Sequence, residues 1–129
     1  MKAAHQAELQ KALNAGNGMV GQRLLSDTDT VRVWRIELAP GERVPFHTHV
    51  LNYFWTALSP GRSRSQFADG HVVETDYETG TTKHFTYGPG EYMVHDLQNI
   101  GHTTLAFTTV ELKLGSANAP LPLPIDPEN

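Results

Sequence analysis

The stretch Gly41-Glu42-Arg43-Val44-Pro45-Phe46-His47-Thr48-His49 decides how this chain of 129 residues is interpreted. Successive side chains of a β-strand leave opposite faces, so His47 and His49 leave the same face and can bind one ion together. Taken alone, a His-x-His pair on a strand is as often a surface coincidence as a pair of metal ligands. The sequence around the pair therefore has to decide between these two interpretations.

The residues on either side of this stretch predict β-structure. From Val20 onward, runs rich in Val, Thr, Tyr, Phe and Trp alternate with turns of Gly, Pro and Asp, as is typical of a sandwich or barrel. The turns Asp69-Gly70 and Thr79-Gly80 are typical of tight hairpins, which make consecutive strands antiparallel. This number of short strands suits a jelly-roll barrel. The eight predicted strands are Val31–Leu38, Arg43–His49, Asn52–Leu58, Arg62–Phe67, His71–Tyr77, Thr81–Tyr87, Glu91–Leu97 and Leu105–Leu114.

Two segments outside the predicted barrel have a different character. Residues Ala3–Leu13 are rich in Ala, Gln, Glu, Lys and Leu and predict a short helix, which the Asn- and Gly-rich residues 14–18 end. From Gly115 the chain is rich in Pro, which cannot donate to a β-ladder, so an extended tail is expected. The predicted organisation is a helical extension at residues 1–19, a barrel at 20–114 and a tail at 115–129.

Composition excludes several classes of partner and site. The formal net charge is −4 and the chain has no Cys. No basic face for nucleic acid or an anionic membrane is therefore expected, and a small-molecule ligand is the natural partner. Without thiolates, any metal must be held by His, Tyr or carboxylate groups. No apolar run reaches signal-peptide or membrane-span length, so a cytoplasmic protein is expected.

Two motifs in the predicted strands resemble those of the cupin superfamily. The first has the form G-x5-H-x-H-x(3,4)-E-x6-G, and the second ends in H-x3-N. The resemblance covers about Val31 to Leu114, and the run from Val31 to His49 also resembles the small single-domain cupins associated with β-alanine degradation. The matching residues are Gly41, His47, His49 and Gly61 in the first motif and His95 and Asn99 in the second.

The resemblance implies both a fold and a metal site. The fold would be a cupin-type jelly roll, a double-stranded β-helix barrel, with the short helix added at the N-terminus. The metal ligands would be His47, His49 and His95 inside the barrel mouth. Imidazoles bind several divalent metals, so the sequence leaves Fe, Zn, Ni, Mn and Cu open. Small cupins of this type are commonly homodimers, and a homodimer is expected here.

The chain departs from the cupin motifs at two places. The glutamate of the first motif is missing, since Tyr53 and Phe54 occupy the two positions allowed for it, and Gly90 lies close to His95, which shortens the second motif. Three imidazoles without a carboxylate leave the full positive charge on the metal, which favours an anionic, chelating ligand. Tyr53 can coordinate, can bind a metal-bound water or ligand, or can pack in the barrel, and the last two roles are favoured.

The remaining polar residues have simpler interpretations. His5, His71, His84 and His102 are expected to be exposed or structural, with His102 as the reserve ligand because of its nearness to His95. Asp96 faces away from His95 by strand alternation, which suggests a role toward solvent or another subunit. Trp34 belongs to an inward apolar row. The arginines that can reach a ligand carboxylate from the rim, although such residues are usually solvated, are Arg32, Arg35 and Arg43.

Three functions follow from these observations. The first is a metal-dependent enzyme, similar to dioxygenases or isomerases, that acts on a small organic acid. The second is a non-catalytic module that binds or senses a small metabolite, which the missing glutamate favours. The third, a metal-free barrel with vestigial histidines, ranks last because all three histidines stand at the motif positions.

Overall fold

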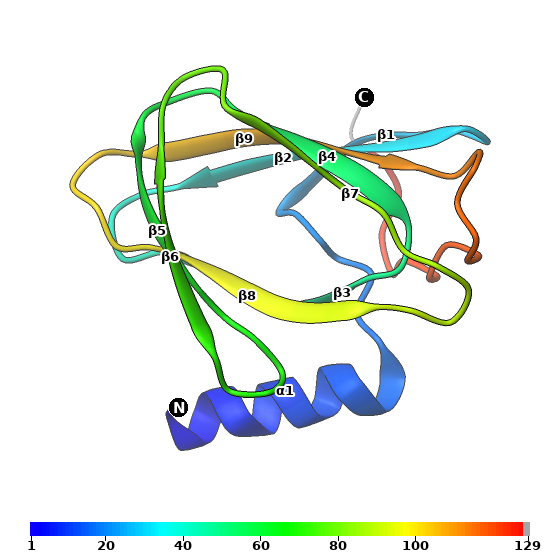
Figure 1. The fold of residues 1–129 in the computed structure, drawn as a ribbon, viewed down its shortest axis with the longest axis horizontal. Helices are drawn as coiled ribbons and strands as arrows, with labels where there is room; N and C mark the ends of the chain where they lie inside the picture. The colour runs from blue at the N-terminus through cyan, green and yellow to red at the C-terminus, as the bar shows by residue number, and fades with distance from the viewer. Residues whose placement is uncertain (128–129) are drawn as a thin grey trace.

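The computed structural model describes residues 1–127 of the chain, a β-barrel with one helix against its outer side (Figure 1). Glu128 and Asn129, the end of the predicted tail, lie outside the described residues. Within residues 1–127, no helix has the length and apolar content needed to cross a lipid bilayer. The elements are α1 (Ala3–Ala15), β1 (Arg23–Asp27), β2 (Val31–Leu38), β3 (Arg43–His49), β4 (Asn52–Ala57), β5 (Gly61–Gln66), β6 (Val72–Tyr77), β7 (Thr82–Phe85), β8 (Met93–Asn99) and β9 (Leu105–Leu112).

The strands form two antiparallel sheets that face each other. The five-stranded sheet has the order β1-β2-β9-β4-β7, and the four-stranded sheet has the order β3-β8-β5-β6. Between them lies the main apolar cluster, which includes Leu38, Leu105 and Phe107. α1 lies against the outer face of β3 and β8, where Leu9 and Ala12 pack on Phe46 and Val94 (Figure 1). The all-β prediction with a short N-terminal helix is confirmed.

The strand prediction is nearly complete, with one omission. All eight predicted strands exist, and their ends agree with the observed ends to within two residues. β1 was not predicted from the sequence. Its sequence, Arg-Leu-Leu-Ser-Asp, does not alternate between apolar and polar residues, only Leu24 is fully buried, and the pairing with β2 is irregular between Leu24 and Ser26. A strand that pairs through a bulge leaves no period of two in the sequence.

A bulge in β3 sets which side chains face the barrel interior. The antiparallel register of β3 with β8 shifts between Val44 and His47. Val44 packs in the main cluster, whereas Phe46 packs on the other face, under α1. An extra residue in one strand reverses the alternation beyond it, and Pro45 suits this place because it has no N–H to donate. His47 consequently points into the barrel.

The turn between β8 and β9 is held by a buried side chain. The Asn99 amide nitrogen donates to the carbonyl oxygens of Leu38 and Thr103 at 2.9 and 2.8 Å, and its carbonyl oxygen accepts from the Gly101 N–H at 2.9 Å. Close packing also explains Gly61, because a Cβ there would lie 2.5 Å from a methyl carbon of Leu105. These contacts give two of the motif residues a structural role.

Asn99→Ala is expected to lower the free energy of unfolding by about 2–4 kcal/mol, because buried carbonyl and amide groups lose their partners. The neighbouring Gln98, whose side chain makes one 3.3 Å bond to Gly41, provides the control, and Gln98→Ala should change stability by less than about 0.5 kcal/mol. Urea denaturation followed by circular dichroism measures both. Equal losses in the two variants would show that Asn99 has no special role.

A buried carboxyl group lies at the β1–β2–β9 side of the barrel. Glu111 is 3% exposed and accepts a 2.7 Å hydrogen bond from the Trp34 indole nitrogen. Arg32, its cross-strand neighbour, donates to the Leu121 carbonyl oxygen of the tail at 2.9 Å. Burial raises the pKa of Glu111 to about 7, although the Trp34 bond and nearby charges of Arg32 and Lys113 oppose the rise. The folded chain therefore binds this proton more tightly than the unfolded chain.

The contribution of Glu111 to the free energy of unfolding should consequently fall as pH rises from about 4.5 to about 7. The reason is that the unfolded chain releases the Glu111 proton at lower pH than the folded chain. The term is about 3 kcal/mol when fully developed. Glu111→Gln keeps an acceptor for Trp34 and removes the titration. Comparing the urea midpoints of both proteins from about pH 5 to about pH 8 isolates this term from other groups. Parallel pH profiles for the two proteins would disprove it.

Candidate metal centre

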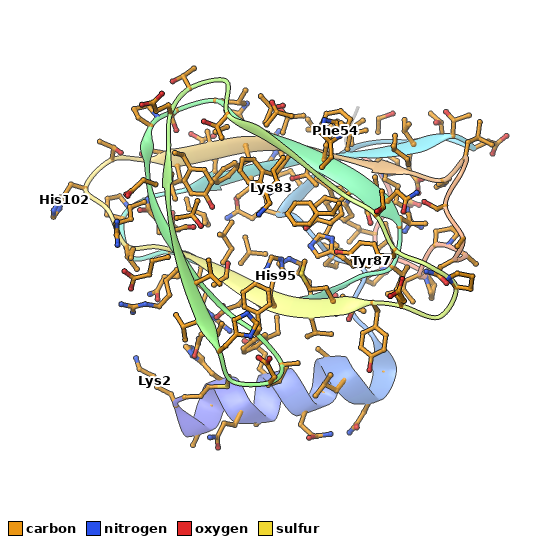
Figure 2. The ribbon with its side chains drawn as sticks, in the orientation of Figure 1. Lys2, Phe54, Lys83, Tyr87, His95 and His102 are labelled. Carbon is orange, nitrogen blue, oxygen red and sulfur yellow. The ribbon has the colours of Figure 1, made fainter. Side chains whose placement is uncertain are left out.

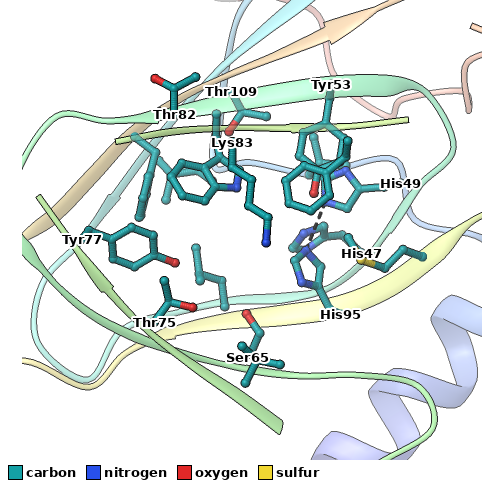
Figure 3. A pocket seen from close by; sticks show the side chains of 18 of the residues that line it. His47, His49, Tyr53, Ser65, Thr75, Tyr77, Thr82, Lys83, His95 and Thr109 are labelled. Carbon is teal, nitrogen blue, oxygen red and sulfur yellow. Dashed lines mark hydrogen bonds between the residues drawn. The ribbon is translucent and has the colours of Figure 1, made fainter. Parts of the chain in front are cut away.

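Three imidazoles meet inside the barrel. His47 and His49 come from β3, and His95 is the cross-strand partner of His47 on β8. Their ring centroids are 4.7 to 5.1 Å apart, and one ligand atom from each lies within 4.8 Å of the others. The Nε2 atoms of His49 and His95 are 3.2 Å apart (Figure 3). The structure thus brings together the three residues that the cupin resemblance names as metal ligands.

Burial keeps these imidazoles neutral. His47 and His49 are each 2% exposed. Burial lowers the pKa of His47 to about 4 and the pKa values of His49 and His95 well below their usual range. The Nδ1–H of His47 donates to the Pro45 carbonyl oxygen at 2.7 Å, which leaves its Nε2 with a free lone pair. Neutral imidazole nitrogens with free lone pairs are the form that binds a divalent metal.

The three histidines fit a divalent cation. The facing Nε2 atoms of His49 and His95 can share only one hydrogen between them, and the buried Nδ1 atoms of both rings have no hydrogen-bond partner. Buried polar groups normally have partners. An ion bound by the facing Nε2 atoms would use both of their lone pairs, while the protons would lie on the Nδ1 atoms, which have no partner among the described residues. Among the described residues, the cluster has no carboxylate member, so the donor set is three imidazoles.

Tyr53 packs against one of these imidazoles. Its ring lies parallel to the ring of His49, at 9° and 4.0 Å between centroids, and its other neighbour in the stack is Phe85 at 4.6 Å. Burial raises the pKa of the Tyr53 hydroxyl well above its usual value, and Tyr87 raises it further. This geometry supports the packing role over the coordinating role among those predicted for Tyr53.

The outer face of the same strands carries a polar network beneath α1. Asp96 accepts hydrogen bonds from Arg43 Nε at 2.7 Å and from the Gln66 backbone N–H at 2.7 Å. Arg43 also pairs with Glu8 of α1, which in turn accepts a hydrogen bond from the Phe46 N–H at 2.9 Å. Asp96 is 1% exposed. The suggestion that Asp96 faces solvent is therefore wrong, because α1 covers it, although strand alternation does turn it away from the metal centre.

The other histidines lie outside the centre. His102 is exposed, and Figure 2 shows it at the end of the molecule away from His95. His71 is hydrogen-bonded to Asp69, and His84 stacks at an angle on Phe54. His5 lies on α1 near Gln66. His102 is thus too distant to act as the reserve ligand considered from the sequence.

The imidazoles form part of the wall of a cavity of about 370 Å³. None of the three arginines considered from the sequence lines it, since Arg32 binds the tail and Arg43 lies under α1. The cation in the wall is Lys83 of β7, which sequence reasoning missed. The sequence did contain a signal for Lys83. It lies two residues before Phe85 on a predicted strand, so both side chains leave the same face, and Phe85 indicates that this face is the interior one. The other lining side chains are mainly aromatic, aliphatic or hydroxyl-bearing, and include Trp55, Phe107, Met93, Ser65, Thr75 and Thr109.

The stacked geometry predicts the behaviour of two Tyr53 variants. Tyr53→Phe should bind as much metal as the wild type, because the stack on His49 remains and only a protonated hydroxyl is lost. Tyr53→Leu should bind metal about 10-fold more weakly, because His49 loses the ring that orients it. Metal titration measures both, and the ferric protein should show no phenolate-to-iron colour. Equal metal loss in both variants, or such a colour in the wild type, would indicate coordination by Tyr53.

Comparison with known proteins identifies the fold. A scan of protein-family models gives no match, and neither does a search of curated proteins. Among solved structures, a cupin domain from Bordetella pertussis matches with a TM-score of 0.60 and 20% identity, over 71% of this chain and 97% of that one. A cupin family protein from Methanocaldococcus jannaschii matches at 0.54 and 22%, over 70% and 76%. A conserved protein from Klebsiella pneumoniae with a double-stranded β-helix domain matches at 0.55 and 22%, over 72% and 76%. This chain therefore has the cupin fold, a double-stranded β-helix barrel.

Proposed function

We propose that this protein binds one divalent metal ion through His47, His49 and His95 and uses it to bind and convert a small organic acid. The observation that carries the proposal is the convergence of three neutral imidazoles, two of them almost completely buried, at a cavity. A divalent ion at this place supplies a Lewis acid or, if it is a redox metal, a centre for oxidation. The protein itself fixes the imidazoles and surrounds the ligand with apolar walls that exclude water.

The chemistry of the site follows from what its residues can hold. The Pro45 carbonyl fixes the tautomer of His47, and the ring of Tyr53 fixes the plane of His49. With no carboxylate among the ligands, a bound ion keeps its full charge. An anionic oxygen donor of the ligand can neutralise part of that charge, which favours a chelating organic acid as the substrate.

A non-catalytic binding or sensing role is the second candidate, and one observation favours it. Among the residues that line the cavity, no carboxylate is present, and burial raises the pKa values of Tyr53 and Tyr77. The cavity therefore has few side chains that can transfer a proton near neutral pH. Oxygen uptake or isomerisation of an added organic acid would favour the enzyme, whereas tight binding without turnover would favour the module. The expected homodimer and cytoplasmic location remain predictions.

The test is metal content. His47→Ala and His49→Ala should each lose most of the metal that the wild type retains after loading and dialysis, because a three-ligand site has no spare ligand. His102→Ala removes an exposed imidazole that lies away from the three histidines, and this variant should keep all of the bound metal. Elemental analysis across Fe, Zn, Ni, Mn and Cu measures metal content, and circular dichroism verifies the fold. Full metal content in either of the first two variants would refute the site.

A further inference from the structure

Lys83 extends from the edge strand β7 into the cavity that contains the three histidines (Figure 3). In the β4–β7 register it lies opposite Trp55, while the next interior residue, Phe85, lies opposite Tyr53. The ammonium group stands 5.2 Å from the centroid of the Phe85 ring. This contact guides the side chain along the cavity wall but does not neutralise its charge.

The cavity has no negative group to balance Lys83. None of the residues that line it is Asp or Glu, and Lys83 has no ion-pair partner within residues 1–127. Other cations of the barrel are paired, as Arg43 is with Glu8 and Lys113 is with Asp27. The Lys83 ammonium is therefore a positive charge without a counter-charge at the cavity wall. An anionic ligand is therefore favoured.

A series of stacked rings leads from Lys83 to the imidazoles. Lys83 is exposed, as are its cavity neighbours Thr81 and Thr82, whereas Tyr77 of the same cavity wall belongs to the main apolar cluster. His47 and His49 are almost completely buried. Phe85, which the ammonium contacts, stacks on Tyr53 at 4.6 Å between centroids, and Tyr53 stacks on His49 at 4.0 Å. The volume of about 370 Å³ is near the lower limit of small-molecule sites.

We propose that Lys83 selects a small dicarboxylate: one carboxylate pairs with the Lys83 ammonium, a short hydrocarbon linker lies along the rings of Phe85 and Tyr53, and the second carboxylate lies at the metal centre. The last contact rests on the proposed metal-binding function, whereas the pairing with Lys83 does not. A monocarboxylate can satisfy only one of the two positive ends. Lys83 is thus a specificity residue, separate from the metal ligands.

The test compares three straight-chain dicarboxylates, succinate, glutarate and adipate, with the monocarboxylate butyrate. Binding to zinc-loaded protein is measured by calorimetry and by tryptophan fluorescence, to which Trp55 in the cavity wall contributes. The wild type should bind at least one dicarboxylate about 10-fold or more tightly than butyrate, since a charge-assisted pair is about that strong. Lys83→Met should remove this preference while zinc content and butyrate affinity stay unchanged, and Lys83→Arg should retain part of it.

Lys11→Met is the matched control, because it changes the net charge equally on the exposed side of α1. It should bind dicarboxylates as the wild type does. Equal affinity for dicarboxylates and butyrate in the wild type, unchanged preference in Lys83→Met, or a similar loss in Lys11→Met would overturn the proposal. If the wild type fails to retain zinc but loses dicarboxylate binding with Lys83→Met, the role of Lys83 stands and the metal function falls. If the wild type retains zinc but shows no preference for dicarboxylates over butyrate, the metal function stands and the role of Lys83 falls.

Discussion

The antiparallel pairing of β3 with β8, interrupted by the bulge at Pro45 and Phe46, is the constraint on which the site depends. Without the bulge, a regular strand that buries Val44 in the barrel would turn His47 outward. The extra residue reverses the alternation and places His47 opposite His95, so that two strands distant in sequence supply one cluster. The same Pro45 offers its carbonyl oxygen to His47 Nδ1. One local irregularity thus determines both the direction and the tautomer of a proposed ligand.

The outer face of these strands explains how the inner face is kept rigid. On β8, His95 faces the cavity, while its neighbour Asp96 faces α1 and binds Arg43 and Gln66. Glu8 of the helix completes the network through Arg43. Buried and fully bonded polar groups hold a unique arrangement more firmly than apolar contacts alone. The N-terminal helix therefore supports the strands that carry the imidazoles, although it contributes no residue to the cavity wall.

The electrostatics of the cavity follow from which charges are paired and which are not. Asp96 and Asp76 pair with arginines outside the cavity, whereas the described cavity wall contains Lys83 without a counter-charge. The cavity wall therefore carries an unbalanced positive charge even before any metal is considered. Neutral imidazoles and aromatic walls add little opposing charge. The histidine ligand set lacks a carboxylate, and this unbalanced positive charge favours an anionic ligand that supplies one.

The sequence alone determined the strand positions, the turns and the shared face of His47 and His49, because alternation and turn chemistry are local properties of the chain. It did not reveal β1, whose irregular pairing leaves no period of two. The burial of Asp96 beneath α1 and of Glu111 beside Trp34 required tertiary structure, since both depend on elements far away in sequence. For the same reason, only the folded chain showed that Lys83 rather than an arginine lies in the cavity. Strand alternation says which residues share a face, but the approach of the two sheets decides what that face encloses.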